Sequence, residues 1–450
     1  MATETRDAPA ATRRARLGPL LGDLQALRQD PLGLFARGAA SGADVVRFRA
    51  AHRNVYLLVG PGAIAHVGIH NRDNYFKGVS YDALRVPLPN ALLTIDGDEA
   101  RERRKLLMPL FTRRSLLPDV STITAAVDDL CRRWDEFART GTEFDVHSEM
   151  NRLTFDVVGR ILVGAELGDE MGRLEASIAR ASEWVARRTR ALVPLPTAIP
   201  TPGNIGYRRN YRALAAWADG LVASSRGATG DGVAGRLVAA SRDGAGMDDR
   251  QLRDEVAAFL MAGHQTTASA LSWTWYLLAR HSGEQERLAE ACEFALAGGA
   301  PDMERLDVVP YLRQVLDEAM RLYPPGWAFT RTPKADDEIA GERVPAGSIV
   351  IVCSYANQRS PRFWDDPETF DPGRFATGRR ESIGPYSYFP FGVGPHACIG
   401  KHLAEIESRL ALALLARRYR VEAVSGAPVA PEPAITLTPR TPIRVRVTRR

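Results

Sequence analysis

The sequence contains little cysteine and no long hydrophobic run. Only four cysteines occur among 450 residues, too few and too scattered for a disulfide framework: Cys131, Cys292, Cys353 and Cys398. We therefore expect free thiols in a reducing compartment, which predicts a cytoplasmic protein. The first residues, MATETRDAPAATRRARLGP, are basic but include no apolar stretch, so the sequence predicts neither a secretory signal nor a membrane anchor.

Charge of one sign is not concentrated anywhere in the chain. The formal net charge is +5, and arginines alternate with acids, as in EARERRK. This distribution argues against nucleic-acid binding and favours an ordinary solvated surface over an acidic docking partner. No repeat or low-complexity tract interrupts the composition. We predict a disordered N-terminus over residues 1–15, a single domain over residues 16–450, and a monomer.

Hydrophobic periodicity predicts a mainly α-helical fold with small β-sheets. Residues 43–60 alternate apolar with polar or basic side chains and stop at Gly60-Pro61, which suits a β-hairpin. Helical spacing runs from Leu116 to Arg190. A proline-rich stretch over residues 194–202 then predicts a loop between helices, because helical spacing resumes directly after it.

The longest periodic segment runs from about Asp248 to Arg280 and opens with a capping pair, Asp248 and Gln251. It is apolar on most faces, so we expect it to cross the core. Its middle, residues 263–267, is a run of poor helix formers and polar residues that should weaken the hydrogen-bond ladder or admit a water. An alternative is a kink stabilised by threonine hydroxyls that bond back to carbonyl groups.

The segment around Cys398, FPFGVGPHACIGKHLAEIESRLALALLARRY, places a thiol behind a glycine-rich loop and at the start of a helix. Backbone N–H groups at a helix N-terminus should lower the pKa of this thiol and make it a metal ligand or a nucleophile. Glycines let the loop approach a flat or bulky partner. His396 and His402 lie nearby, but no zinc-ligand spacing accompanies them, and no paired histidine for a catalytic cysteine is visible.

The pattern Phe391-x-x-Gly394-x-x-x-Cys398-x-Gly400 resembles the haem-binding loop of the cytochrome P450 family. This resemblance implies the P450 fold, in which a long central helix lies over a buried haem b. It also implies that Cys398 is the thiolate ligand of the haem iron, which favours cleavage of the O–O bond. Phe391, Gly392 and Gly400 would complete the loop against the haem.

A second resemblance lies in the helix YLRQVLDEAMRLYPP, where Glu318 and Arg321 share one face. In the family such a pair joins an arginine of a later loop, here Arg374, in a structural triad around the haem. Gly373 stands where the family often has glutamate, which affects the expected geometry of that loop only. If either residue stood alone, an exposed helix pair worth about 0.3 kcal/mol would be the preferred interpretation.

The polar run Ala262 to Thr267 resembles the oxygen-binding groove of the family's central helix. The resemblance implies that Ala262 lies against the haem and that the hydroxyl of Thr266 steers protons to bound oxygen. Gln265 stands where the family usually has an acid. An amide can hold water but has no titratable proton, so proton delivery should depend mainly on Thr266 and ordered water.

The basic segment DGDEARERRKLLMPLF is similar to the family's propionate-binding helix. Arg104 matches its arginine, whereas Ala100 replaces a common tryptophan or histidine, so one propionate contact should be missing. Arg331 and His396 match the other positions that pair with propionates through charge-assisted hydrogen bonds. The alternative for each of them is ordinary surface charge.

Substrate contacts follow from position in the family, with these residues as candidates: Val79, Leu84, Arg85, Leu88, Leu92, Ala258, Met261, Trp327, Phe329 and Leu437. The set is mostly apolar, which suits a terpenoid or a polyketide better than a sugar or a nucleotide. Arg85 could meet a polar tail of the substrate.

Three functions follow from the resemblance. The first is a monooxygenase of bacterial secondary metabolism, such as antibiotic biosynthesis, that hydroxylates an apolar small molecule with O2. Its electrons would come from a ferredoxin and a ferredoxin reductase, because the chain has no flavin or iron–sulfur motif. The second keeps the haem but forms a ring or a C–O bridge, or rearranges the substrate, with Gln265 as its hint. The third is a non-catalytic haem sensor, against which Thr266 counts.

Overall fold

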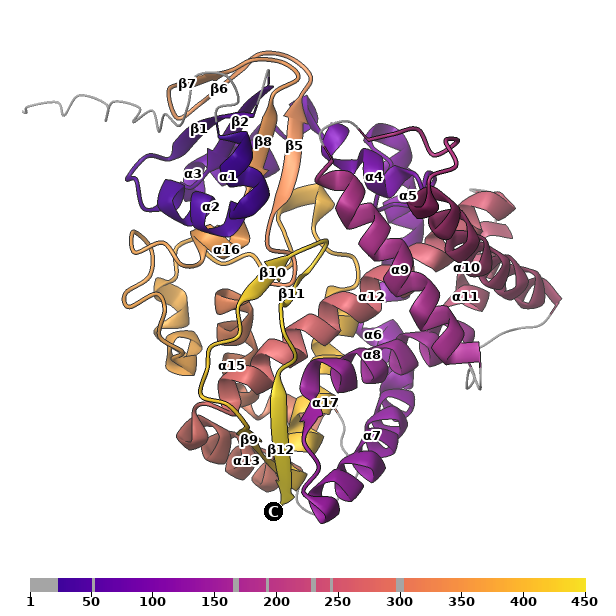
Figure 1. Ribbon diagram of the computed structural model, residues 1–450, viewed down its shortest axis with the longest axis vertical. Coiled ribbons are helices and arrows are strands. Elements are labelled where there is room, and N and C mark those ends of the chain that lie inside the picture. Colours follow the sequence, from indigo (N-terminus) through magenta and orange to yellow (C-terminus); the bar gives the residue numbers. More distant parts are fainter. Residues whose placement is uncertain are drawn as a thin grey trace, which may run out of the picture.

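A computed structural model gives the positions of residues 23–50, 53–164, 170–191, 194–227, 232–242, 246–296 and 303–450. The segment 1–15, which the sequence predicts to be disordered, lies outside these residues. The mainly α-helical fold with small β-sheets is confirmed. In Figure 1 a β-rich part lies at the upper left, and a larger helical part fills the centre and the right.

The helices of the described residues have the following bounds: α1 Leu24–Gln29, α2 Pro31–Ala39, α3 Pro61–Ala65, α4 Asp82–Arg85, α5 Gly97–Leu107, α6 Arg113–Leu116, α7 Val120–Thr140, α8 Val146–Val163, α9 Glu170–Thr189, α10 Pro202–Gly227, α11 Val233–Arg242, α12 Asp249–Leu278, α13 Ser282–Leu296, α14 Met303–Asp307, α15 Pro310–Leu322, α16 Ser354–Asn357 and α17 Lys401–Arg418. Within this part of the chain, no helix is both long and apolar enough to cross a bilayer.

The strands have the following bounds: β1 Val45–Ala50, β2 Arg53–Leu58, β3 Tyr75–Phe76, β4 Phe144–Asp145, β5 Phe329–Pro333, β6 Asp337–Ile339, β7 Glu342–Val344, β8 Ile349–Val352, β9 Tyr419–Ala423, β10 Pro431–Pro433, β11 Leu437–Pro439 and β12 Arg444–Arg449. The largest sheet has the order β1-β2-β8-β5-β3. The predicted hairpin is confirmed as β1 and β2, which pair antiparallel with Val46 opposite Leu57. Strand β2 also pairs in parallel with β8, where Leu57 lies opposite Ile351.

Helix α12 crosses the helical part, as its apolar pattern predicts (Figure 1). The capping pair is present: the Asp248 carboxylate accepts from the Gln251 N–H at 2.8 Å, and the side-chain amide oxygen of Gln251 accepts from the Asp248 N–H at 3.0 Å. The helix continues through its polar run. There the Thr266 hydroxyl donates to the Ala262 carbonyl at 2.7 Å, so the threonine back-bond of the alternative interpretation is present.

Helix α15 supplies a fully buried ion pair to the core. The Arg321 guanidinium donates to both carboxylate oxygens of Glu318, at 2.7 Å and 2.9 Å. Arg374 approaches the same carboxylate at 3.4 Å, and the Asp371 N–H donates to it at 2.9 Å. The structure therefore brings the three residues of the expected triad together, and the carboxylate is well supplied with donors.

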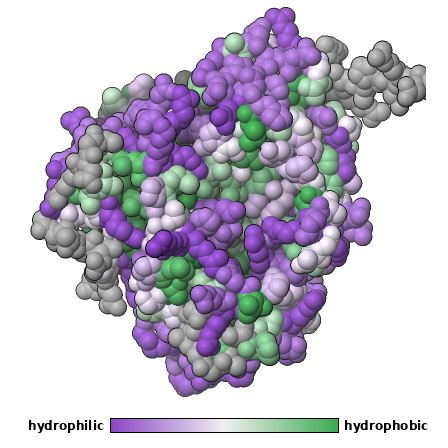
Figure 2. Space-filling view, turned by 180° about the vertical axis from the view of Figure 1, so that it is seen from behind, coloured by the Kyte–Doolittle hydropathy of each residue, from purple (hydrophilic) through white to green (hydrophobic). Residues whose placement is uncertain are grey.

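The surface seen from behind is predominantly hydrophilic, with separate apolar patches (Figure 2). Scattered apolar side chains of this kind are normal on a globular protein. This view fits the solvated surface that the sequence predicts.

Candidate active site

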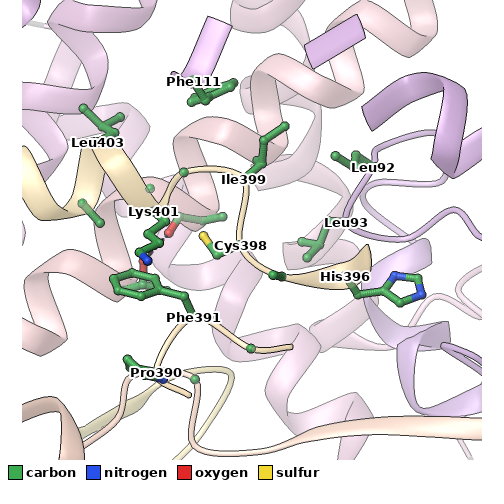
Figure 3. Close-up of a pocket in the computed structure, with 18 of the residues that line it drawn as sticks. Leu92, Leu93, Phe111, Pro390, Phe391, His396, Cys398, Ile399, Lys401 and Leu403 are labelled. Carbon is green, nitrogen blue, oxygen red and sulfur yellow. Dashed lines mark hydrogen bonds between the residues drawn. The ribbon is translucent and has the colours of Figure 1, made fainter. Parts of the chain in front are cut away.

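A cavity of about 1620 Å³ lies between α12, α5, the segment that follows β3, and the loop over residues 390–400. Most of its wall near α12 is apolar, with these side chains among others: Leu92, Leu93, Phe111, Ala258, Phe259 and Phe329. Cys398 also lines the cavity. Figure 3 shows the loop curving around Cys398, with His396 at the side that faces Leu93.

Local backbone geometry keeps the Cys398 loop close to its surroundings. The Cys398 N–H donates to the Phe391 carbonyl at 2.8 Å, which closes the loop. Gly394 has φ +66°, and a Cβ atom there would lie 2.0 Å from the Gly68 carbonyl oxygen, so only glycine fits. Helix α17 begins at Lys401, two residues after Ile399. The thiol is therefore held at a fixed point facing the cavity.

The pKa of the Cys398 thiol is raised, whereas the sequence predicts a lowered pKa. Burial raises the pKa of the thiol, while the Gly400 N–H and the charges of Arg104 and Lys401 lower it. The side chain is open to the cavity but enclosed by the surrounding chain, so desolvation prevails and the prediction of a lowered pKa is wrong. Binding of a metal ion is the usual way in which such a thiol loses its proton.

Basic side chains converge at one rim of the cavity. Arg104, Arg331 and His396 all line it, as does Lys77. The pKa of His396 falls to about 3 because the side chain is buried and because Arg331, Lys77 and Arg104 lie close to it. Repulsion among these groups makes the rim a site for an anionic group. These residues fit the carboxylates of a haem.

Sequence reasoning missed Lys77. Its side chain is buried, and its ammonium donates to the carbonyls of Leu92 at 2.8 Å and Ile95 at 2.6 Å. Burial lowers its pKa to about 8, with the charge of Asp96 opposing that shift. The only sequence signal is a lone lysine after a short strand. Ala100 lines the same cavity without a polar atom, so Lys77 adds a donor to a rim that lacks the family's common aromatic residue.

We expect Lys77→Met to weaken haem retention, because it removes one cation from a rim built for carboxylates. Loss of one charge-assisted hydrogen bond predicts roughly a tenfold faster transfer of haem to apomyoglobin. Lys105→Met is the matched control, because the Lys105 side chain is 72% exposed and pairs with Glu102. Equal transfer rates for wild type and Lys77→Met would contradict this role.

One face of α12 opens onto the cavity opposite the loop. Ala258, Ala262 and Thr266 line it at successive turns, and Ala262 is the most exposed of the three. Gln265 does not line the cavity. Its amide donates to the Ser182 hydroxyl on α9 at 3.1 Å. The structure therefore separates the two residues that the sequence places together: Thr266 faces the cavity and Gln265 links two helices.

Some of the candidate substrate residues line the cavity and others do not. Leu92, Ala258 and Phe329 line the cavity. The remaining candidates do not: Val79, Leu84, Arg85, Leu88, Met261, Trp327 and Leu437. Two of them are fully buried in packing, Leu88 and Leu437. Phe111 and Phe259, which the sequence did not indicate, supply apolar wall instead; their rings lie 4.8 Å apart.

Arg85 does not meet a polar tail in this structure. Its guanidinium donates to the carbonyls of Gly78 at 2.8 Å and Thr94 at 3.3 Å, and pairs with Asp82 and Asp96. All of these partners belong to the segment between β3 and α5. The side chain stabilises that segment, which corrects the expectation of a substrate contact.

A broad cavity with one thiol on its floor and basic side chains at its rim suits a flat, metal-containing group that carries carboxylates. Haem b is such a group, so fold and site define a haem-thiolate protein. The chain belongs to the cytochrome P450 family, whose sequence model matches residues 14–447. The protein is accordingly a cytochrome P450 monooxygenase with haem b as its cofactor.

Curated relatives cover nearly the whole chain. It is 34% identical to cyclooctat-9-en-7-ol 5-monooxygenase of Streptomyces melanosporofaciens, over 91% of this chain and 89% of the relative. It is 32% identical to cyclooctatin synthase of the same organism, over 93% and 92%. It is 28% identical to pentalenene oxygenase of Streptomyces avermitilis, over 96% of both chains.

Proposed function

We propose that this protein hydroxylates an apolar, cyclic terpenoid in bacterial secondary metabolism, in the cytoplasm. The observation that carries the proposal is the apolar cavity wall between α12 and Leu92, placed over the thiol of Cys398. An apolar wall with few polar groups selects by shape and hydrophobicity. The relatives named for cyclooctat-9-en-7-ol and pentalenene support a terpenoid over a polyketide.

A spectral titration tests the substrate class. Cyclic terpene hydrocarbons and their mono-alcohols should shift the Soret band of the haem-loaded protein, and polyketide lactones of similar size should not. Turnover under labelled dioxygen should then place one labelled oxygen atom in the product. A product without label would favour ring closure or rearrangement instead. No shift with any terpenoid would contradict the proposal.

In this proposal the Cys398 thiolate would hold the haem iron, and the bound haem would supply the activation of dioxygen. Arg104, Arg331, His396 and Lys77 hold the haem carboxylates at the rim. Gly392, Gly400 and Phe391 would let the loop approach the haem closely, and the small side chain of Ala262 would leave room for it beside α12. These assignments rest on the positions of the side chains around the cavity.

Thr266 has the role of positioning a proton donor. Its hydroxyl lines the cavity while donating to the Ala262 carbonyl, so its oxygen can accept a hydrogen bond from a water molecule there. We expect Thr266→Ala to lower product formed per reductant consumed by about tenfold, with peroxide released instead. Gln265→Glu should change this ratio little, because residue 265 faces Ser182 rather than the cavity.

Thr274→Ala is the matched control for the loss of a hydroxyl from α12. The Thr274 hydroxyl bonds back to the Ala270 carbonyl at 2.7 Å, in the same way as that of Thr266, but Thr274 does not line the cavity. Thr274→Ala should keep the wild-type coupling, that is, the wild-type amount of product formed per reductant consumed. Unchanged coupling in Thr266→Ala would overturn the assignment.

The alternative of oxidative ring closure, C–O bridge formation or rearrangement loses its specific support. It depended on Gln265 as an unusual group near the reacting atoms, whereas its side chain contacts α9. The electron donors in the proposal remain a ferredoxin and a ferredoxin reductase acting on a monomer. Lys401, directly after the Cys398 loop, is exposed and supports docking of an acidic iron–sulfur protein.

A further inference from the structure

The segment over residues 88–96 forms one wall of the cavity. Leu92, Leu93 and Asp96 line it, and Figure 3 shows Leu92 and Leu93 on the side of the site where His396 lies. The segment contains little regular structure. Its shape must therefore come from contacts with neighbouring elements. Several of these contacts are made by buried carboxylates and cations, which are rare in a protein interior.

Two consecutive carboxylates of α12 bind this wall through its N–H groups. The Glu255 carboxylate accepts from the Leu92 N–H at 2.7 Å. The Asp254 carboxylate accepts from the side-chain amide of Asn90 at 2.8 Å and from its N–H at 3.2 Å. Both carboxylates are 1% exposed. Buried charges are kept in place only when their partners are well placed, so these contacts fix the wall closely.

Two cations complete the arrangement from the other side. One terminal nitrogen of Arg103 donates to Glu255 at 2.8 Å and to the Asn90 carbonyl at 2.8 Å. The ammonium of Lys77 donates to the Leu92 carbonyl at 2.8 Å. The N–H of Leu92 thus meets an anion and its carbonyl meets a cation, so its backbone is held from both ends.

Glu255 stands at the centre of these contacts. Burial raises its pKa to about 7, and the charge of Arg103 and the N–H of Leu92 oppose that shift. The ionised form of this carboxylate is therefore stabilised by Arg103 and by the Leu92 N–H, the same groups that the carboxylate holds in place. Glu255 reaches α5 through Arg103 and the wall through Leu92, and thereby joins the central helix to both.

We propose that Glu255 is a positioning residue that sets which carbon of the substrate is oxidised, by fixing the Leu92 wall over the site. The inference rests on the proposed function, because an apolar substrate offers few polar groups and must be oriented by the walls around it. A displacement of about 1 Å in such a wall changes which C–H bond is presented.

The test is Glu255→Gln, which keeps the shape of the side chain and removes its charge. The wild-type ratio of the major to the minor hydroxylated product should fall by about fivefold, and exchange of the Leu92 amide hydrogen should quicken by about tenfold. Haem content and the carbon monoxide spectrum should stay at wild-type values, because the hydrogen bonds of Glu255 go to Leu92 and Arg103 and not to the Cys398 loop.

Glu99→Gln is the matched control. Glu99 contacts Arg103 at 3.5 Å from the exposed side and does not touch the wall. It should leave both the product ratio and amide exchange unchanged. Arg103→Lys keeps the charge but shortens the side chain by one bond, so its ammonium should not reach the place from which the guanidinium contacts Glu255 and Asn90. It should shift the product ratio and the exchange rate in the same direction as Glu255→Gln, and it supplies the test if that variant does not fold.

Amide exchange is measured without substrate, so the outcome is separable from the proposed function. Absence of terpenoid turnover in wild type would contradict the proposed function while faster Leu92 exchange still supported the positioning role. An unchanged product ratio, or unchanged Leu92 exchange, in folded Glu255→Gln or Arg103→Lys would overturn the inference.

Discussion

Replacing Cys398 by serine is expected to abolish the far-shifted Soret band of the reduced carbon monoxide complex. This band depends on a thiolate ligand, and among the described cysteines only Cys398 lines the cavity. Product formation should fall below detection, because electron donation from the thiolate promotes O–O cleavage. The measurement is a reduced carbon monoxide difference spectrum of freshly purified protein, together with product analysis.

Cys292→Ala is the control for the loss of a sulfur atom. Cys292 is fully buried in α13, and burial raises its pKa to about 12, so it stays a neutral packing residue. Its variant should keep the wild-type spectrum and lose only some thermal stability. A far-shifted band in Cys398→Ser, or a spectrum like that of a histidine-ligated globin in wild type, would contradict the assignment of Cys398.

Glu318→Ala should cost roughly 3 to 5 kcal/mol of unfolding free energy, because it leaves the buried Arg321 guanidinium without its anion. Arg321 keeps its carbonyl contacts, at 2.9 Å to Gln358 and 2.7 Å to Pro367, but these carry no full charge. Such a loss is comparable with much of a domain's stability. Soluble yield, haem content and Tm should all fall, whereas the identity of the product should not change.

Arg132→Ala is the control with the same spacing on a helix. Arg132 pairs with Asp129 three residues earlier, as Arg321 pairs with Glu318, but the Arg132 side chain is 73% exposed. Solvent screens this pair, so its Tm should match that of wild type. Wild-type haem content and Tm in Glu318→Ala would show that the buried pair is not needed.

The sequence located the parts of the site that depend on local chemistry. A thiol needs glycines in front of it and a helix behind it to face a bulky partner, and both lie within ten residues of Cys398. Arg104, Arg331 and His396 were found through the resemblance to the family's propionate-binding positions, and all three line the cavity. Lys77 was missed because nothing around it in the chain indicates that it is buried beside them.

The separation of Thr266 and Gln265 shows where pattern alone fails. The two residues are adjacent in α12, and a helix turns by about 100° per residue, so neighbours point in different directions. Which direction meets the cavity depends on how α12 packs against α9, where Ser182 receives the Gln265 amide. Arg85 is misplaced for a different reason: its side chain is long, but carbonyl groups of its own segment bind it.

The sequence by itself therefore determined the helical class, the β1–β2 hairpin, the long central helix with its cap, and the thiol that the loop presents. Each of these follows from contacts within a few residues, where periodicity, capping and glycine conformation act directly. Only the tertiary structure decided the pKa of Cys398, the direction of Gln265 and the charged contacts that hold Leu92. These depend on burial and on partners that are distant in the sequence, such as Ser182 for Gln265 and Glu255 for Leu92, and no local pattern encodes them.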